Sequence, residues 1–303
     1  MRDLTDFQQK LRDLLPETEL RFWENLSGHT SFRIGGPAEV MAFPKTREEL
    51  ANILKVSALL DCKPAILGAG TNVLAPDEGL PGLTICLKDC LFGMERLDET
   101  CIRLMAGVTM ARGAVFAAKA GLGGMEFAHG IPGTIGGGVY MNAGAYGGDL
   151  SQIVESVEVM DRMGKIRTLS HEKMQFSYRH SVLEDTGDIV LSVVLRLEPR
   201  STEEIQADMK ALIAKRSASQ PLDLPSAGSA FKRPLGGYAA ALIDAAGLKG
   251  FRVGNAAISQ KHAGFAVNLG GATAQDVKEL LTQVSDRVYE NSGIRLEPEV
   301  RIW

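Results

Sequence analysis

The chain has 303 residues, of which 45% are hydrophobic and 23% are charged, and its net charge is −4. This length predicts two or three domains or subdomains, with enough apolar residues to bury a core without disulfides or metals. The acidic balance argues against a broad nucleic-acid surface, because such a surface needs clustered Lys and Arg. A local basic pocket for a small anionic ligand is compatible with these values.

The N-terminal segment and the cysteines predict a cytoplasmic protein without a metal centre. Residues 1–15 are amphipathic but lack the uninterrupted apolar core of a signal peptide, and no stretch is apolar enough to span a membrane. We expect a monomer. The four cysteines have no zinc-ligand spacing and are expected to be buried thiols: Cys62, Cys86, Cys90 and Cys101.

Helix and strand patterns alternate along the chain from about residue 38. In the first half we predict strands at 38–44, 64–70, 83–87 and 102–107, and helices at 46–60 and 109–119. Three antiparallel strands are then predicted at 153–161, 165–170 and 188–198. The remaining predictions are helices at 203–216, 238–246 and 274–291, a strand at 262–268 and an alternating C-terminal strand at 294–303.

Two glycine-rich segments indicate a ligand that carries phosphate. Eleven of the 33 glycines fall within residues 121–148, and the stretch LGAGTNVL (67–74) follows a predicted buried strand. Glycine permits positive φ and close approach of backbone N–H groups, which form concave anion sites. A tight turn without a ligand is the alternative, and it is the more serious one for residues 67–74.

The two best-known nucleotide motifs are absent. The dinucleotide fingerprint G-x-G-x-x-G fails because Val73 stands where the third glycine is needed, and no glycine run ends in Gly-Lys-Ser/Thr. We therefore disfavour a Rossmann or P-loop site.

Several motifs in register give a specific resemblance. HTSFRIGGPAEVMAFP (29–44), LGAGTNVL (67–74) and GIPGTIGGGVYMNAGAYGG (130–148) resemble the flavin domain of the UDP-N-acetylenolpyruvoylglucosamine reductase (MurB) family. FSYRHS (176–181), PSAGSAFKRP (225–234), KHAGFAVN (261–268) and LEPEVRIW (296–303) match the same family in the same order.

The resemblance implies an α+β protein. Its two-subdomain FAD-binding fold, of the PCMH/vanillyl-alcohol-oxidase-like type, precedes a C-terminal α+β substrate domain. The implied divisions are 1–88 for FAD-binding subdomain 1 with the N-terminal helix, 89–213 for FAD-binding subdomain 2 and 214–303 for the substrate-binding domain.

The implied cofactors are non-covalent FAD and NADPH as hydride donor. The residues that the resemblance places on FAD are Gly68, Ala69, Gly70, Thr71, Asn72, Gly130, Ile131, Pro132, Gly133, Thr134, Gly138, Asn142, Ala143 and Gly144.

Three residues are candidates for the chemistry on local grounds. Arg179, in FSYRHS, is either a solvated cation or a bidentate grip for a carboxylate. Ser229 lies among small residues that let a substrate approach, although an ordinary loop serine has the same neighbours. Glu299 lies on the charged face of the C-terminal strand, and that face is either solvated or holds a carboxylate rigidly at a site.

The resemblance assigns these three residues roles. It implies that Arg179 and Glu299 polarise the substrate carboxylate and that Ser229 donates a proton. The implied reaction reduces UDP-N-acetylglucosamine enolpyruvate to UDP-N-acetylmuramate in peptidoglycan synthesis, which serves cell wall biogenesis, cell shape and cell division. The candidates for substrate binding are Tyr178, Gln260, Lys261 and His262.

The chain departs from the family pattern at two places, and two other functions stay open. Arg233 stands where some members carry asparagine, and the stretch 178–197 is too short for the loop that some members fold over the substrate. One alternative is another flavin oxidoreductase of the same fold. The other is a non-catalytic module that binds flavin or a UDP-sugar.

Overall fold

The structure is a computed structural model that describes residues 4–303. The chain forms two compact units. Unit 1 comprises the residues up to Phe22, Val40–Ala69 and Gly82–Lys215, and unit 2 comprises Trp23–Glu39, Gly70–Pro81 and Arg216–Trp303. Each unit has its own hydrophobic core. The longest segment of unit 2 begins at Arg216, near the boundary predicted at 214, and unit 2 also includes two earlier segments. The division of residues 1–213 into two subdomains stays a prediction.

The helices of the first two thirds of the chain agree with the sequence patterns, with two short additions. They are α1 (Asp6–Leu14), α2 (Arg47–Leu59), α3 (Met110–Lys119), α4 (Ile135–Tyr140), α5 (Leu183–Thr186) and α6 (Thr202–Ser219). Thr46 and Thr109 cap α2 and α3 by accepting the amide three residues on. The additions are the glycine-rich α4 and the four-residue α5. The 3₁₀ turns of unit 1 are η2 (Glu126–Ala128), η3 (Leu150–Gln152) and η4 (Glu172–Met174).

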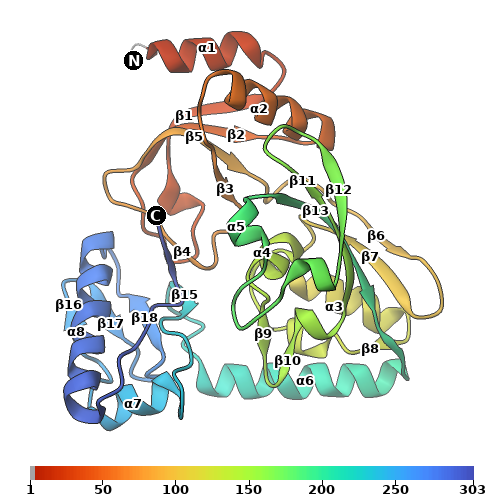
Figure 1. Ribbon diagram of the computed structural model, residues 1–303. Coiled ribbons are helices and arrows are strands. Elements are labelled where there is room, and N and C mark those ends of the chain that lie inside the picture. The colour runs from red at the N-terminus through yellow and green to blue at the C-terminus, as the bar shows by residue number, and fades with distance from the viewer. Residues whose placement is uncertain (1–3) are drawn as a thin grey trace. The chain divides into compact units, whose positions relative to one another are not determined.

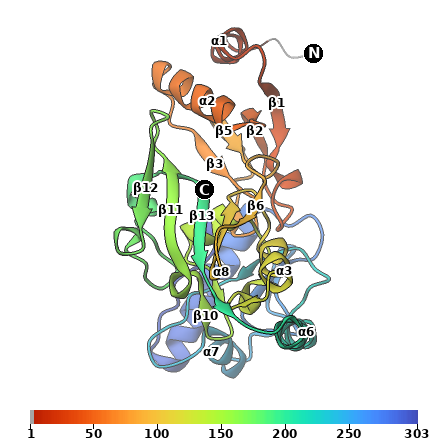
Figure 2. The ribbon, with the colours of Figure 1, turned by 90° about the vertical axis from the view of Figure 1, so that its right-hand side faces the viewer.

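A five-stranded antiparallel sheet is the centre of unit 1 (Figures 1 and 2). Its order is β12 (Ile166–Ser170), β11 (Val154–Met160), β13 (Ile189–Arg196), β7 (Cys101–Met105) and β6 (Met94–Arg96). β13 is almost entirely buried because it pairs with β11 and β7 and its Ile, Val and Leu side chains serve the core. The edge strand β12 is largely exposed. The three antiparallel strands predicted from the sequence are confirmed.

A second sheet has the order β1 (Glu19–Asn25), β2 (Pro37–Phe43), β5 (Leu80–Cys86) and β3 (Ala65–Leu67). The chain crosses the division between the units within β1, β2 and β5. In unit 1, Leu50, Ile53 and Leu54 of α2 share the core with Val40 and Ile85 of the sheet. Two short pairs complete this part: β8 (Leu122–Gly123) with β14 (Glu198–Pro199), and β9 (Gly144–Ala145) with β10 (Gly148–Asp149).

Unit 2 is built on a four-stranded antiparallel sheet against which α8 lies (Figure 1). The sheet order is β15 (Ser226–Ser229), β18 (Phe265–Asn268), β17 (Ala256–Ile258) and β16 (Arg252–Val253), and the helices are η1 (Leu26–Gly28), α7 (Ala239–Ala245) and α8 (Ala274–Ser292). The apolar face of α8 is buried as the spacing predicts, and Gly293 ends the helix at φ 72°.

The C-terminal segment is not the regular strand predicted from its alternation. Only β19 (Arg301–Ile302) is a strand, and it pairs in parallel with β4 (Val73–Leu74). Pro298 has no N–H, so pairing there is reduced to a bridge with Phe231. Leu296 and Val300 are buried as predicted, but Ile302 is 44% exposed.

Three of the four cysteines are buried as expected, and Cys62 is not. Cys86, Cys90 and Cys101 are buried, Cys62 is half-buried, and burial raises the pKa of the Cys90 thiol to about 11. Among the helices described between residues 4 and 303, none combines the length and apolarity that crossing a membrane requires.

Asp77 is expected to stabilise unit 2 through the start of α8. Its Oδ1 accepts the Ala274 amide at 2.7 Å and its Oδ2 accepts the Gln275 amide at 3.1 Å. Asp77→Ala removes both acceptors and the negative charge at the helix N-terminus, so the free energy of unfolding should fall by about 1–2 kcal/mol. Denaturant unfolding measures it, and Glu290→Ala on the exposed end of α8 is the control. Equal stability of the two variants would contradict this assignment.

Candidate active site

The glycine segment after residue 130 folds as the short helix α4 rather than as an open loop. Thr134 caps the helix, and its Oγ1 accepts the Gly137 amide at 3.4 Å. The Ile135 amide donates to Val108 O at 2.8 Å, and the Gly136 amide donates to Ala106 O at 2.9 Å. The first-turn amides of α4 are therefore used within unit 1. The residues from Gly130 to Thr134, before the helix, are therefore the part of this segment where a phosphate would be held.

Close packing accounts for part of the glycine density. A Cβ on Gly136 would lie 3.0 Å from Ala106 Cβ, and one on Gly138 would lie 2.8 Å from Met110 Sδ. A Cβ on Gly144 would lie 2.5 Å from Asp149 Cβ. Gly133 needs glycine for a different reason, because its φ is 123°. The sequence analysis interpreted this density as a sign of a phosphate-bearing ligand, and the core of unit 1 requires several of these glycines independently.

The stretch before α4 fits a large phosphate-bearing cofactor. A Cβ on Gly68 would lie 3.2 Å from Thr134 Oγ1, so the two predicted glycine segments meet in unit 1 at these residues. His129 Nδ1, directly before Gly130, is buried and has no hydrogen-bond partner among residues 4–303. Bare backbone at Gly68, Gly130 and Gly133 beside an available imidazole nitrogen suits the phosphates of FAD. Ala69 and Ile131 are half-buried there, and Pro132 is exposed.

The rest of the first glycine loop belongs to unit 2 and supports the C-terminal segment. Gly70 has φ 63°, and a Cβ there would lie 2.1 Å from His29 O, so only glycine fits. Asn72 Nδ2 donates to Glu299 O at 3.2 Å, and Asn72 O accepts the Arg301 amide at 3.0 Å. The sequence analysis places Asn72 on FAD; its side-chain amide is also bound to the backbone of Glu299, and its assignment to the cofactor stays a prediction.

Arg179 lies in unit 1 in a tight turn beside the glycine segment. The turn is closed by the Ser177 amide on His180 O at 3.1 Å, and Arg179 itself has φ 56°. Arg179 Nη2 donates to Gly144 O at 3.0 Å, and its guanidinium lies 4.9 Å from the Tyr178 ring centre. Tyr178 is half exposed. The guanidinium is therefore held by protein groups rather than freely solvated, and its role toward a carboxylate stays a prediction.

Ser229 and Glu299 are brought together in unit 2. Ser229 ends β15 and is exposed, and the next residue, Ala230, accepts the Glu299 amide at 2.9 Å. The Lys232 amide donates to Glu297 O at 2.8 Å, so both sides of Pro298 are paired with the segment after Ser229. A hydroxyl and a carboxylate, 70 positions apart in the chain, thus lie on neighbouring backbone segments.

Comparison with known proteins identifies the family. Residues 38–170 match a family model described as "FAD binding domain", and residues 220–303 match one described as "UDP-N-acetylenolpyruvoylglucosamine reductase, C-terminal domain". The UDP-N-acetylenolpyruvoylglucosamine reductase of Caldanaerobacter subterraneus is 44% identical over 97% of this chain and 96% of its own length. The chain belongs to the UDP-N-acetylenolpyruvoylglucosamine reductase family.

Other relatives agree with this assignment. The reductase of Streptococcus pneumoniae is 41% identical over 97% of both chains. The crystal structure of the Thermus caldophilus enzyme is 38% identical, covers 95% of this chain and 99% of that one, and has a TM-score of 0.78. The expected α+β fold, with a FAD-binding part and a C-terminal domain of this reductase family, is confirmed.

The three residues predicted to bind substrate beside β18 have local structural partners. The Gln260 side chain lies against Gly250, where a Cβ would come within 2.0 Å of Nε2. Lys261 Nζ donates to Ser217 O at 2.7 Å. His262 Nδ1 accepts the Gly264 amide at 3.1 Å, and its ring meets Phe265 edge-on at 5.0 Å between centres. Their assignment to the reductase substrate stays a prediction.

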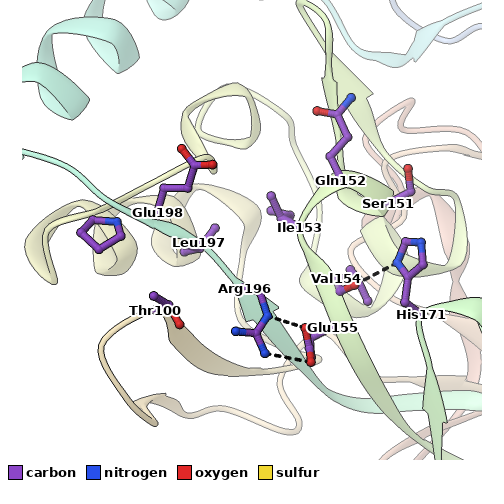
Figure 3. Close-up of a pocket in the computed structure, with 11 residues that line it drawn as sticks. Thr100, Ser151, Gln152, Ile153, Val154, Glu155, His171, Arg196, Leu197 and Glu198 are labelled. Atoms are coloured by element: carbon purple, nitrogen blue, oxygen red, sulfur yellow. Dashed lines mark hydrogen bonds and ion pairs between the residues drawn. The ribbon is translucent and has the colours of Figure 1, made fainter.

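A hollow of about 540 Å³ in unit 1 does not coincide with the predicted site (Figure 3). Arg196 lines it and binds Glu155 through Nε at 2.7 Å and Nη2 at 2.9 Å, which holds the pKa of that carboxyl below its usual range. His171 Nδ1 lies 3.0 Å from Val154 O. Because these groups already have partners, the hollow shows no reactive arrangement.

The sequence analysis missed two residues that shape the glycine-rich region. Glu126 Oε2 accepts the Gly124 amide at 2.7 Å, and Arg200 Nη1 binds Glu126 Oε1 at 3.0 Å. Arg200 lies 74 positions from Glu126, so no local pattern connects them. Their strand neighbours, β8 and β14, are too short to be recognised from alternation.

Gly138→Ala is expected to destabilise the protein while Gly137→Ala does not. The new methyl group at 138 meets Met110 Sδ at 2.8 Å and Leu150 Cδ1 at 3.1 Å, whereas at 137 the nearest atom is Thr134 Oγ1 at 3.6 Å. Overpacking of this kind costs about 1–3 kcal/mol, and Ala is the better helix former. Thermal unfolding of both variants measures the difference. A Gly138→Ala variant as stable as Gly137→Ala would contradict the packing explanation.

The His262 ring is expected to be neutral at pH 7. Burial disfavours its charged form and lowers its pKa below the ordinary 6.5, and the Gly264 amide requires an unprotonated Nδ1. The folded state is thus stabilised by the neutral ring, and this contribution is lost as pH falls through the lowered pKa. A histidine titration by NMR, assigned with His262→Gln, measures it. A pKa at or above 6.5 would show that the ring is not held in this way.

Proposed function

We propose that this protein reduces UDP-N-acetylglucosamine enolpyruvate to UDP-N-acetylmuramate with NADPH, as a cytoplasmic monomer in peptidoglycan synthesis. The observation that carries the proposal is the bond from the Glu299 amide to Ala230 O at 2.9 Å, which places the Glu299 segment beside the segment that carries Ser229. Neither residue would need such a rigid arrangement in a module that only binds flavin. The family match at residues 220–303 supports it, because that match covers the segment holding both residues.

The residues that would hold FAD in unit 1 are Gly68, Ala69 and the stretch from Gly130 to Thr134. Bound FAD supplies hydride transfer from NADPH to the methylene carbon, C3, of the enolpyruvyl group. This transfer leaves negative charge at C2 and in the adjacent carboxylate, and the protein has to stabilise both.

We assign the charge stabilisation to Arg179. Its guanidinium is held by Gly144 O and the Tyr178 ring, so little rotamer freedom is lost when it binds a carboxylate. Its positive charge lowers the energy of the developing enolate. Glu299 contributes through hydrogen bonds beside Ser229.

We assign the donation of the proton to Ser229. Its exposed hydroxyl donates to C2, and the hydroxyl is then reprotonated from solvent. A hydroxyl is a weak acid, but the carbanionic C2 is basic enough to take its proton. The added hydride and this proton together complete the reduction of the double bond.

The experiment is anaerobic reduction of the purified yellow protein with NADPH, followed by addition of the UDP-linked enolpyruvyl sugar. We expect the flavin to be reoxidised and UDP-N-acetylmuramate to form. Protein that is colourless and cannot be reconstituted with FAD would disprove the flavin assignment. Reoxidation by oxygen but not by this substrate would point to another flavin oxidoreductase.

Ser229→Ala is expected to slow reoxidation by the substrate by about 10²–10⁴-fold, the usual loss for a general acid. Flavin reduction by NADPH should stay near the wild-type rate, since no proton from Ser229 is needed there. Ser217→Ala, an exposed serine of the same unit, is the matched control. Reoxidation of Ser229→Ala at the control rate would remove this residue from the mechanism.

A further inference from the structure

Asn142 has both ends of its side chain engaged within unit 1. The residue is only 3% exposed. Its Nδ2 donates to Ser177 O at 3.0 Å, and its Oδ1 accepts the Ser151 amide at 2.9 Å. An amide committed on both sides is a structural connector between the glycine segment and the turn that carries Arg179.

The Asn142 backbone is also specialised for this position. Its φ is 43°, in the left-handed region that asparagine enters more readily than most other residues. The Asn142 amide donates to Val139 O at 3.2 Å and so ends α4. The end of α4 therefore fixes where the side chain of Asn142 points.

Two more hydrogen bonds join the same two segments. Ser181 Oγ donates to Tyr140 O at 2.8 Å, and Arg179 Nη2 donates to Gly144 O at 3.0 Å. Residues 140–144 thus bind the Arg179 turn at Ser177, at Arg179 itself and at Ser181. Asn142 lies in the middle of this attachment.

The Arg179 turn depends on such outside support. Arg179 has φ 56°, in the left-handed region that residues other than glycine rarely adopt. Within the turn, backbone bonds join Ser177 and His180, and at its base the Val182 amide donates to Met174 O at 2.8 Å. A conformation of this kind persists when its surroundings hold it.

We propose that Asn142 is a positioning residue for Arg179, fixing the turn so that the guanidinium is aimed at the substrate carboxylate. This inference rests on the proposed function and extends it. It predicts that loss of the Asn142–Ser177 bond slows substrate reduction far more than flavin reduction. The expected defect lies in kcat rather than in KM for NADPH.

The test is Asn142→Asp in the FAD-loaded protein. The aspartate is nearly isosteric and still accepts the Ser151 amide, but its carboxylate has no proton to donate to Ser177 O. Reoxidation by the UDP-linked enolpyruvyl sugar should slow about 10–100-fold more than reduction by NADPH does. Asn291→Asp, on the exposed end of α8, is the control for the added charge.

Two further measurements separate positioning from a general structural effect. In an Arg179→Ala background, Asn142→Asp should cost less than threefold, because the group that it positions is absent. Hydrogen exchange of residues 176–182 should be faster in Asn142→Asp than in Asn291→Asp before any substrate is added. The proposal would be overturned if Asn142→Asp slowed flavin reduction and flavin reoxidation equally. It would also be overturned if Asn142→Asp slowed reoxidation by the same factor with and without Arg179.

A second variant covers the case in which Asn142→Asp does not retain FAD. Ser181→Ala removes the neighbouring bond to Tyr140 O and should show the same selective loss at smaller size, and normal reoxidation in it would then overturn the proposal. Wild-type protein that is not reoxidised by the sugar contradicts the proposed function itself. Normal wild-type turnover with an unaffected Asn142→Asp contradicts only the positioning role.

Discussion

The hydrogen bonds from the first turn of α4 to the 106–108 segment are the interaction on which the candidate site in unit 1 depends. Ile135 and Gly136 donate to Val108 O and Ala106 O, directly after the strand β7. A six-residue helix with three glycines has little helix propensity of its own. The bonds to the 106–108 segment, together with the close fit at Gly138, hold it in place and thereby set the positions of Gly133 before it and Asn142 after it.

Each of the two glycine segments contains an asparagine whose side chain hydrogen-bonds to a distant part of the backbone. Both asparagines also lie where a ligand is expected. Asn142 binds Ser177 O in unit 1, and Asn72 binds Glu299 O in unit 2. Both asparagines were expected to bind the cofactor, and both hold the chain beside a residue assigned to the chemistry. A side-chain amide suits this purpose because it donates and accepts in fixed directions without carrying a charge.

Unit 2 shows how segments that are distant in the sequence complete one core. Phe32 and Ile34 from the first segment and Leu74 from the second are buried with Val277, Leu281 and other residues of the C-terminal part. Asp77 accepts the first amides of α8, and β4 pairs with β19. Unit 2 therefore depends on residues that lie about 140 or more positions before its main segment begins.

The amino-acid sequence by itself determined most elements and the family. Helices α2, α3 and α8 followed from apolar spacing with threonine caps, because these signals are local. The motifs around Arg179, Ser229 and Glu299 placed the chain among the reductases, as the relatives confirm. Only the tertiary structure decided which glycines serve packing, how Pro298 interrupts the last strand and which carbonyls the two asparagines bind. These features depend on contacts between residues that are far apart in the chain, and local propensity does not determine such contacts.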